Sequence, residues 1–163
     1  MRIVPNPTGL GPERLNLNPR RLVILLRSAT GYRQVLDAAG LLPPEHSEGT
    51  PCLADPLDRG GLSIDEGALR IRMEHWLSCG SSDATNTRFI IRHAQGRFRL
   101  IGIDRSEQSR MSGARSECSI NYLTGRMKLT EGLNHIARSR PVVKWQPLAG
   151  PTAFYPNRFE SRP

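Results

Sequence analysis

The sequence predicts a mainly β protein, α+β at most, formed by an antiparallel sheet of successive hairpins with long irregular loops and little helix. Apolar residues alternate with polar ones in short runs between residues 21 and 145, as half-buried strands require. Turn signals such as Gln95-Gly96 and Thr124-Gly125 separate consecutive runs. The 13 prolines and 15 glycines among 163 residues favour many short elements over a helical bundle.

A single β-rich domain, residues 21–146, is expected between two irregular ends. A chain of 163 residues suits one domain with a core of its own. Residues 1–20 show no periodicity and hold several prolines and glycines, so we expect an extended N-terminal arm there. The proline-rich residues 147–163 are expected to form an irregular C-terminal tail.

The first hairpin is expected around a turn at Ser28–Gly31. Arg21–Arg27 is an apolar run of the buried-strand type, and Tyr32–Leu36 returns as its partner. Residues 37–44 hold one helical turn at most, because the prolines that close this segment cannot continue a helix. A long loop from His46 to Gly61 follows.

The second hairpin joins a short strand, Gly61–Asp65, to a long strand, Ala68–Leu77, through a turn at Glu66-Gly67. Side chains of the long strand alternate between two faces. One face carries Leu69, Ile71, Met73, His75 and Leu77, and the other carries Arg70, Arg72, Glu74 and Trp76. Ser78–Thr87 is expected to be a polar loop.

The third hairpin turns at Gln95-Gly96, which sets Arg92 opposite Arg99 and Ile91 opposite Leu100. The residues that then face the core are Phe89, Ile91, Phe98 and Leu100. A slip of one residue would turn the arginines inward, so the pattern specifies this register strongly.

A fourth hairpin follows a predicted polar loop at Arg105–Gly113. It turns at Thr124-Gly125 and places Ile120, Tyr122, Met127 and Leu129 on one face. Glu131–Ser139 is expected to carry a short helix, and Pro141–Trp145 is expected to be the last short strand.

Basic side chains gather at the outward positions of these strands. The chain has 23 basic and 15 acidic residues, a net charge of +8, and its lysines are Lys128 and Lys144 alone. The arginine bias reflects either the base composition of the coding sequence or an anionic partner. The predicted binding surface consists of Arg70, Arg72, Trp76, Arg88, Arg92, Arg97, Arg99, Arg126 and Lys128. Among the aromatic residues Trp76 alone is expected at an outward position, so this face offers few platforms for stacking nucleic-acid bases.

The three cysteines fit no zinc pattern, since none belongs to a Cys-x-x-Cys pair. Cys52 and Cys79 lie in predicted loops, and Cys79 is flanked by small residues. Such positions suit a disulfide better than two core thiols, and free thiols are the alternative. Cys118 falls in a predicted strand, where we expect a small packed side chain rather than a nucleophile.

The sequence predicts no catalytic residue, no metal ligand and no cofactor. No two of the four histidines share a metal-ligand spacing, and neither a Gly-x-Ser-x-Gly nor a Gly-x-Gly-x-x-Gly motif is present. His75 and His93, at core-facing positions, are expected to be structural. The alternatives are a site that they form together near Cys79, or a hydrolase that uses one of them with a nearby carboxylate.

Localisation has no positive signal in the sequence itself. No apolar run reaches the roughly 18 residues that cross a bilayer. Met1–Pro7 lacks the apolar segment of a signal peptide. Taken as a complete chain, the protein is expected to be cytoplasmic, without a membrane span.

Six segments of the chain carry a family resemblance that implies a different localisation. They are Asn16–Arg21, Leu42–Pro44, Pro51–Leu57, Trp76–Ser81, Gly96–Gly102 and Ser119–Arg126. Together they resemble a family of uncharacterised envelope proteins exported by Gram-negative bacteria, over the chain from about Gly9 to Trp145. Members of this family begin with a signal peptide and an Asp-rich segment, and this sequence starts without either, as a truncated version would. The resemblance implies a periplasmic or otherwise exported protein in an oxidising compartment, which supports the Cys52–Cys79 bridge. It implies no catalytic residue.

The expected function is therefore non-catalytic binding outside the cytoplasm, with a protein partner in the envelope that carries acidic groups. One version is an inhibitor or immunity-type protein that plugs a partner's active site, because a rigid sheet loses little entropy on binding. The alternative is a nucleic-acid-binding module that uses the arginine-rich sheet face. The oligomeric state is left open.

Overall fold

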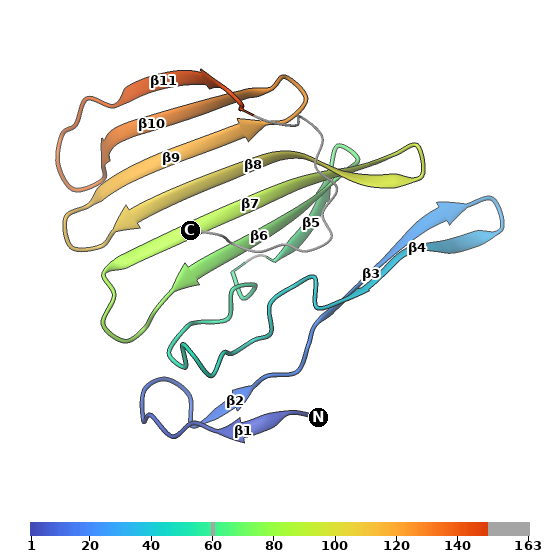
Figure 1. Ribbon diagram of the computed structural model, residues 1–163, viewed down its shortest axis with the longest axis horizontal. Helices are drawn as coiled ribbons and strands as arrows, with labels where there is room; N and C mark the ends of the chain where they lie inside the picture. The colour runs from blue at the N-terminus through green and yellow to red at the C-terminus, as the bar shows by residue number, and fades with distance from the viewer. Residues whose placement is uncertain (60, 150–163) are drawn as a thin grey trace.

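Successive hairpins build one open sheet of seven strands. The computed structural model describes residues 1–59 and 61–149. Its regular secondary structure in these residues consists of β-strands alone. The strands of the large sheet are β5 (Leu62–Asp65), β6 (Ala68–Trp76), β7 (Asp83–Ala94), β8 (Arg97–Ser109), β9 (Ala114–Asn121), β10 (Arg126–Asn134) and β11 (Val142–Pro147). Their order, β11-β10-β9-β8-β7-β6-β5, follows the chain, and every pairing is antiparallel (Figure 1). The predicted mainly β, antiparallel class is confirmed.

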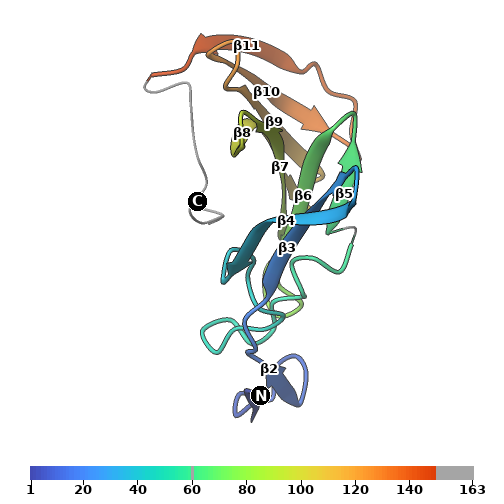
Figure 2. The ribbon, with the colours of Figure 1, turned by 90° about the vertical axis from the view of Figure 1, so that its right-hand side faces the viewer.

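Two further hairpins precede the large sheet. The first pairs β1 (Ile3–Pro5) with β2 (Arg14–Asn16), and the second pairs β3 (Arg21–Ser28) with β4 (Gly31–Ala39). The large sheet is curved, and the β3–β4 hairpin lies beside its β5 and β6 end (Figure 2). This arrangement covers part of one sheet face, and no other strand of residues 1–59 and 61–149 packs on the opposite face.

The core lies between the covered face of the sheet and the β3–β4 hairpin. Ile71 at its centre is 0% exposed. The other buried members are Leu22, Leu41, Leu42, Met73, Phe89, Ile91 and Leu100. Alternation along the strands supplies the sheet residues of this cluster, and Phe98 packs against it as predicted.

The register of β7 and β8 is the predicted one at their shared turn. Arg92 pairs with Arg99, and Ile91 pairs with Leu100. A bulge follows, because Ile90 pairs with Gly102 and leaves one extra residue in β8. The alternation beyond this point shifts by one position, which the sequence pattern does not reveal.

β7 and β8 are longer than the sequence pattern predicts. β7 begins at Asp83 and β8 ends at Ser109, so much of the predicted polar loops Ser78–Thr87 and Arg105–Gly113 is strand. Polar residues pair across this part of the ladder. The prediction failed because backbone hydrogen bonding to two neighbouring strands sustains a strand even where neither face alternates in hydrophobicity.

The short helix expected at Glu131–Ser139 is absent. β10 continues to Asn134 through the residues expected to form a helix, with a register shift between Thr130 and Leu133. Gly132, with φ of 73°, takes the left-handed conformation inside this bulge, which a helix does not tolerate. Residues 37–44 were expected to hold one helical turn at most, and they contain none, since β4 extends to Ala39.

The N-terminal arm is more ordered than expected. β1 and β2 form a short ladder inside residues 1–20. The His46 side chain accepts a hydrogen bond at Nδ1 from the Asn16 amide (3.0 Å), and the His46 amide donates back to the Asn16 carbonyl (3.1 Å). The predicted C-terminal tail, residues 147–163, lies outside the described residues from position 150 onward.

Candidate binding surface on the large sheet

One face of the large sheet carries every residue of the predicted binding surface, and we call it the charged face. Residues paired across antiparallel strands point to the same side of the sheet. One row across the sheet runs from Arg72 through Arg88, Asp104 and Ser119 to Lys128. Arg70, Trp76, Arg92 and Arg126 stand an even number of residues from this row on their strands, and Arg97 and Arg99 pair with outward residues of β7.

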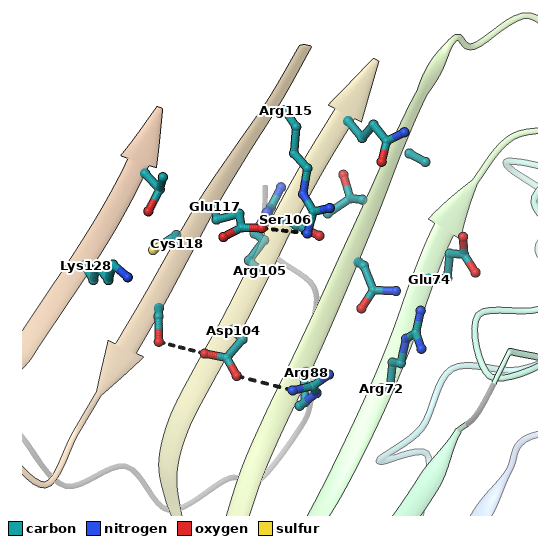
Figure 3. Close-up of a pocket in the computed structure, with 16 residues that line it drawn as sticks. Arg72, Glu74, Arg88, Asp104, Arg105, Ser106, Arg115, Glu117, Cys118 and Lys128 are labelled. Atoms are coloured by element: carbon teal, nitrogen blue, oxygen red, sulfur yellow. Dashed lines mark hydrogen bonds and ion pairs between the residues drawn. The ribbon is translucent and has the colours of Figure 1, made fainter. Parts of the chain in front are cut away.

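Acidic side chains interrupt the arginines on this face (Figure 3). Asp104 accepts a hydrogen bond from the Ser119 hydroxyl (2.7 Å) and lies 3.8 Å from the Arg88 guanidinium. The Arg115 guanidinium lies 2.6 Å from Glu117 Oε1. Sequence reasoning missed these acids, because they fall in segments that were expected to be loops or were not assigned to a face.

The centre of the charged face is hollowed. The hollow has a volume of about 490 Å³ and spans β6 to β10. Its charged lining residues are Arg72, Glu74, Arg88, Asp104, Arg105, Arg115, Glu117 and Lys128, and its neutral polar lining includes Asn86, Ser106 and Gln108. The hollow therefore offers hydrogen-bond donors and acceptors and side chains of both signs of charge.

The end of the β7–β8 hairpin is the most basic part of this face. Arg92 and Arg99 stand directly opposite each other, and Arg97 pairs with Ala94 next to the turn. Like charges opposite each other in a sheet are destabilising.

The two tryptophans differ from the prediction in how far they are exposed and in which face they occupy. Trp76 is half-buried, and the Arg59 and Arg110 guanidinium groups lie 5.7 Å and 5.2 Å from its ring. Trp145 is 57% exposed and pairs with Lys128, so it lies on the charged face. The Arg126 guanidinium lies 4.8 Å from its ring. The expectation that Trp76 is the one outward aromatic residue was wrong. Trp145 lies on the short strand β11, and the sheet face that its side chain occupies depends on the register of β11 with β10.

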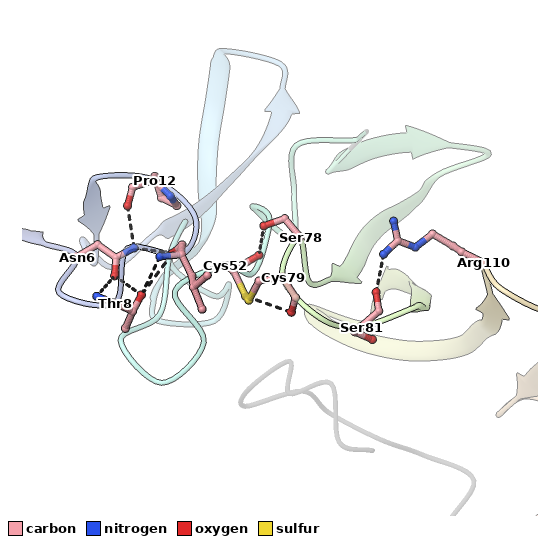
Figure 4. The surroundings of a disulfide bond; sticks show 9 residues. Asn6, Thr8, Pro12, Cys52, Ser78, Cys79, Ser81 and Arg110 are labelled. Carbon is pink, nitrogen blue, oxygen red and sulfur yellow. Dashed lines mark hydrogen bonds between the residues drawn. A yellow bond between two sulfur atoms is a disulfide. The ribbon is translucent and has the colours of Figure 1, made fainter.

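Cys52 and Cys79 lie at disulfide distance, with bonded sulfur atoms and Cα atoms 5.8 Å apart (Figure 4). The Ser78 amide and hydroxyl both donate to the Cys52 carbonyl at 2.9 Å, which fixes the two segments to each other.

Cys118 is half-buried in β9. Burial raises the pKa of its thiol above the ordinary value of 9.0, against a smaller opposing effect of Arg105, so the nucleophilic thiolate is scarce near neutral pH.

The structure separates the histidines that were considered for a joint site. His75 pairs with Thr85 at one end of β7, whereas His93 pairs with Phe98 at the other end. Eight residues of extended chain between positions 85 and 93 span about 26 Å. The His93 ring packs on the Phe98 ring with centroids 4.8 Å apart, which is a structural contact. Within residues 1–59 and 61–149, no cluster of His, Cys, Asp or Glu side chains is arranged to hold a metal ion.

The residues with known positions include no helix that is long and apolar enough to cross a membrane. Comparison of the chain with protein-family models, with curated proteins and with solved structures found no match.

Proposed function

We propose that the protein is a non-catalytic binding protein that engages a protein partner through its charged face. The observation that carries this proposal is the interleaving of basic and acidic side chains around a 490 Å³ hollow on an open sheet. Complementary charges of both signs fix the register of a protein partner and exclude wrong partners. The antiparallel ladder holds these side chains in place, so little backbone entropy is lost on binding.

Charge pairing on this face argues for a protein over a polyanion. Arg70 forms an ion pair with Asp65, and Arg88 and Arg115 each have an acidic neighbour. A phosphate backbone would be attracted by the arginines and repelled by these carboxylates. A protein surface can match both signs at once.

Export to an oxidising compartment completes the proposal. The Cys52–Cys79 pair is positioned for a disulfide, and disulfides persist in the periplasm or outside the cell. The resemblance to exported envelope proteins supports the same compartment. An inhibitor or immunity-type role, in which the face blocks a partner's active site, fits a rigid charged sheet.

Capture experiments with matched baits test this function. We expect the wild-type protein to retain a saturable protein partner from a periplasmic extract. A bait with Arg72→Glu and Arg88→Glu should lose that partner, because both changes reverse charges beside the hollow. A bait with Arg33→Glu, at an exposed position on β4, should retain it. Retention of the same partner by all three baits would exclude the charged face as its binding site.

Trp145 favours a second candidate function, binding of single-stranded nucleic acid. An exposed indole beside Arg126 and Lys128 combines a stacking platform with phosphate-binding cations. An oligonucleotide should then bind with an affinity that falls steeply as salt rises, and Trp145→Ala should weaken it. Absence of binding at low salt would remove this candidate.

A further inference from the structure

A second surface, away from the charged face, is an apolar groove between β3 and β5. Its volume is about 560 Å³. Its lining includes Val23, Leu25, Leu62, Ile64, Leu69, Ile91 and Phe98. Leu25 is 54% exposed, Leu62 46% and Ile64 77%, so the groove leaves a substantial apolar area in contact with water.

One wall of the groove is a free strand edge. β5 ends the large sheet, and among the described residues it pairs with β6 alone. The Arg72 amide donates to the Gly61 carbonyl (2.8 Å), which makes Gly61 a residue that bonds toward β6. Along an edge strand, the amide and carbonyl of one residue point toward the neighbouring strand and those of the next residue point away from it. The amides and carbonyls of Leu62 and Ile64 therefore point away from β6.

The opposite wall has the same character. Within the described chain β3 pairs with β4 alone. The Gly40 amide donates to the Arg20 carbonyl (3.0 Å), so by the same alternation Arg21 and Val23 direct their backbone groups away from β4. In Figure 1 β3 runs opposite to β6, and β5 is antiparallel to β6, so the two walls run in the same direction.

We propose that this groove binds an extended apolar segment of a partner protein, which adds to the large sheet as a strand antiparallel to β5 and lies against β3. An extended chain is the occupant that supplies backbone donors and acceptors to an exposed strand edge, which a lipid tail or a compact apolar molecule does not do. A segment with apolar residues at alternate positions would place them beside Leu62 and Ile64, which line the groove. The proposal does not depend on the function of the charged face.

Peptide selection followed by affinity measurement tests the proposal. A displayed library of random 12-residue peptides is selected on the wild-type protein, and the most enriched sequences should carry apolar residues at alternate positions. The leading peptide is then labelled and titrated by fluorescence anisotropy. We expect Ile64→Asp to weaken it at least tenfold, because a carboxylate then lies in the groove. Tyr32→Asp, at an exposed β4 position that does not line the groove, should bind within twofold of the wild type.

A chemical variant of the peptide separates strand addition from simple apolar binding. N-methylation of alternate amides removes the donors toward β5 while the side chains stay the same, and it should also weaken binding at least tenfold. Equal binding of the methylated peptide, unchanged binding to Ile64→Asp, or no enrichment of alternating sequences would each overturn the proposal. A result in which the wild-type protein sediments as a dimer and the Ile64→Asp variant sediments as a monomer would also overturn the proposal. The occupant of the groove would then be a second copy of this chain.

Discussion

At the scale of single residues, a clamp between Arg20 and Asp55 fastens the start of β3 to the long loop. The Arg20 guanidinium donates to both carboxylate oxygens, at 2.7 Å and 2.6 Å, and the Leu57 amide donates to one of them at 2.9 Å. Burial alone would raise the pKa of Asp55, but the hydrogen bonds from Arg20 and Leu57 outweigh it and hold the pKa below its usual range. The clamp therefore favours the folded state while Asp55 is ionised.

Asp55→Asn should lower the free energy of unfolding at pH 7 by about 2 kcal/mol, the scale of hydrogen bonds to a charged group. Because the pKa is lower in the folded state, the contribution is complete above the unfolded pKa of roughly 4 and is lost as the pH falls through the folded pKa. Urea unfolding between pH 7 and pH 2 measures this. Asp58→Asn, at an exposed position three residues later, is the matched control. An acid-induced loss as large in Asp55→Asn as in the wild type would contradict the assignment.

Cys118 gives a second prediction at this scale. Because burial raises the pKa of its thiol above 9.0, alkylation by iodoacetamide should be slow at pH 7.5 and should accelerate above pH 9. The rate is measured by mass spectrometry, with Cys118→Ser as the unlabelled control. Fast labelling at pH 7.5 that levels off below pH 8 would show a reactive thiol instead.

At the scale of elements, the Cys52–Cys79 bond joins the long loop to the segment after β6. The two residues are separated by 27 positions, and removing a cross-link of that loop length destabilises a folded chain by about 3.5 kcal/mol. The double variant with Cys52→Ser and Cys79→Ser should lose that amount in urea unfolding. In protein made in an oxidising compartment, the intact mass should rise by about 2 Da on reduction. Three free thiols in that material would contradict the bond and the proposed compartment.

The sequence predicted elements well where turn chemistry and alternation agreed. The hairpin at Gln95-Gly96 was predicted to the residue, because two arginines and an apolar stripe specify one register. The polar ends of β7 and β8 were not predicted, because their pairing comes from neighbouring strands rather than from their own pattern. The strand end after Thr130 was read as helix, because the bulge at Gly132 is defined by its φ of 73° and leaves no periodic signal.

At the scale of the whole molecule, the candidate surface was partly predictable. The alternation along each strand placed the arginines and Glu74 on the charged face. The positions of Asp104, Glu117 and Trp145 required the order and register of the strands. In the described residues, an open sheet with one face partly covered and the other lined by polar side chains presents a wide surface. That surface and the separate apolar groove at β5 are chemically different, and they are the two sites at which we propose that partners bind.

The most direct test of the central claim is NMR mapping of the amides that shift when the captured partner is titrated into isotope-labelled protein. We expect the largest shifts on strands β6 to β10, at Arg72, Arg88, Asp104 and Lys128 and their neighbours. The β3–β4 hairpin, with its exposed Arg33, should be unaffected by contact with the charged face. Shifts confined to the hairpin, to the β5 groove or to the N-terminal arm, with the strands of the charged face unmoved, would contradict the claim.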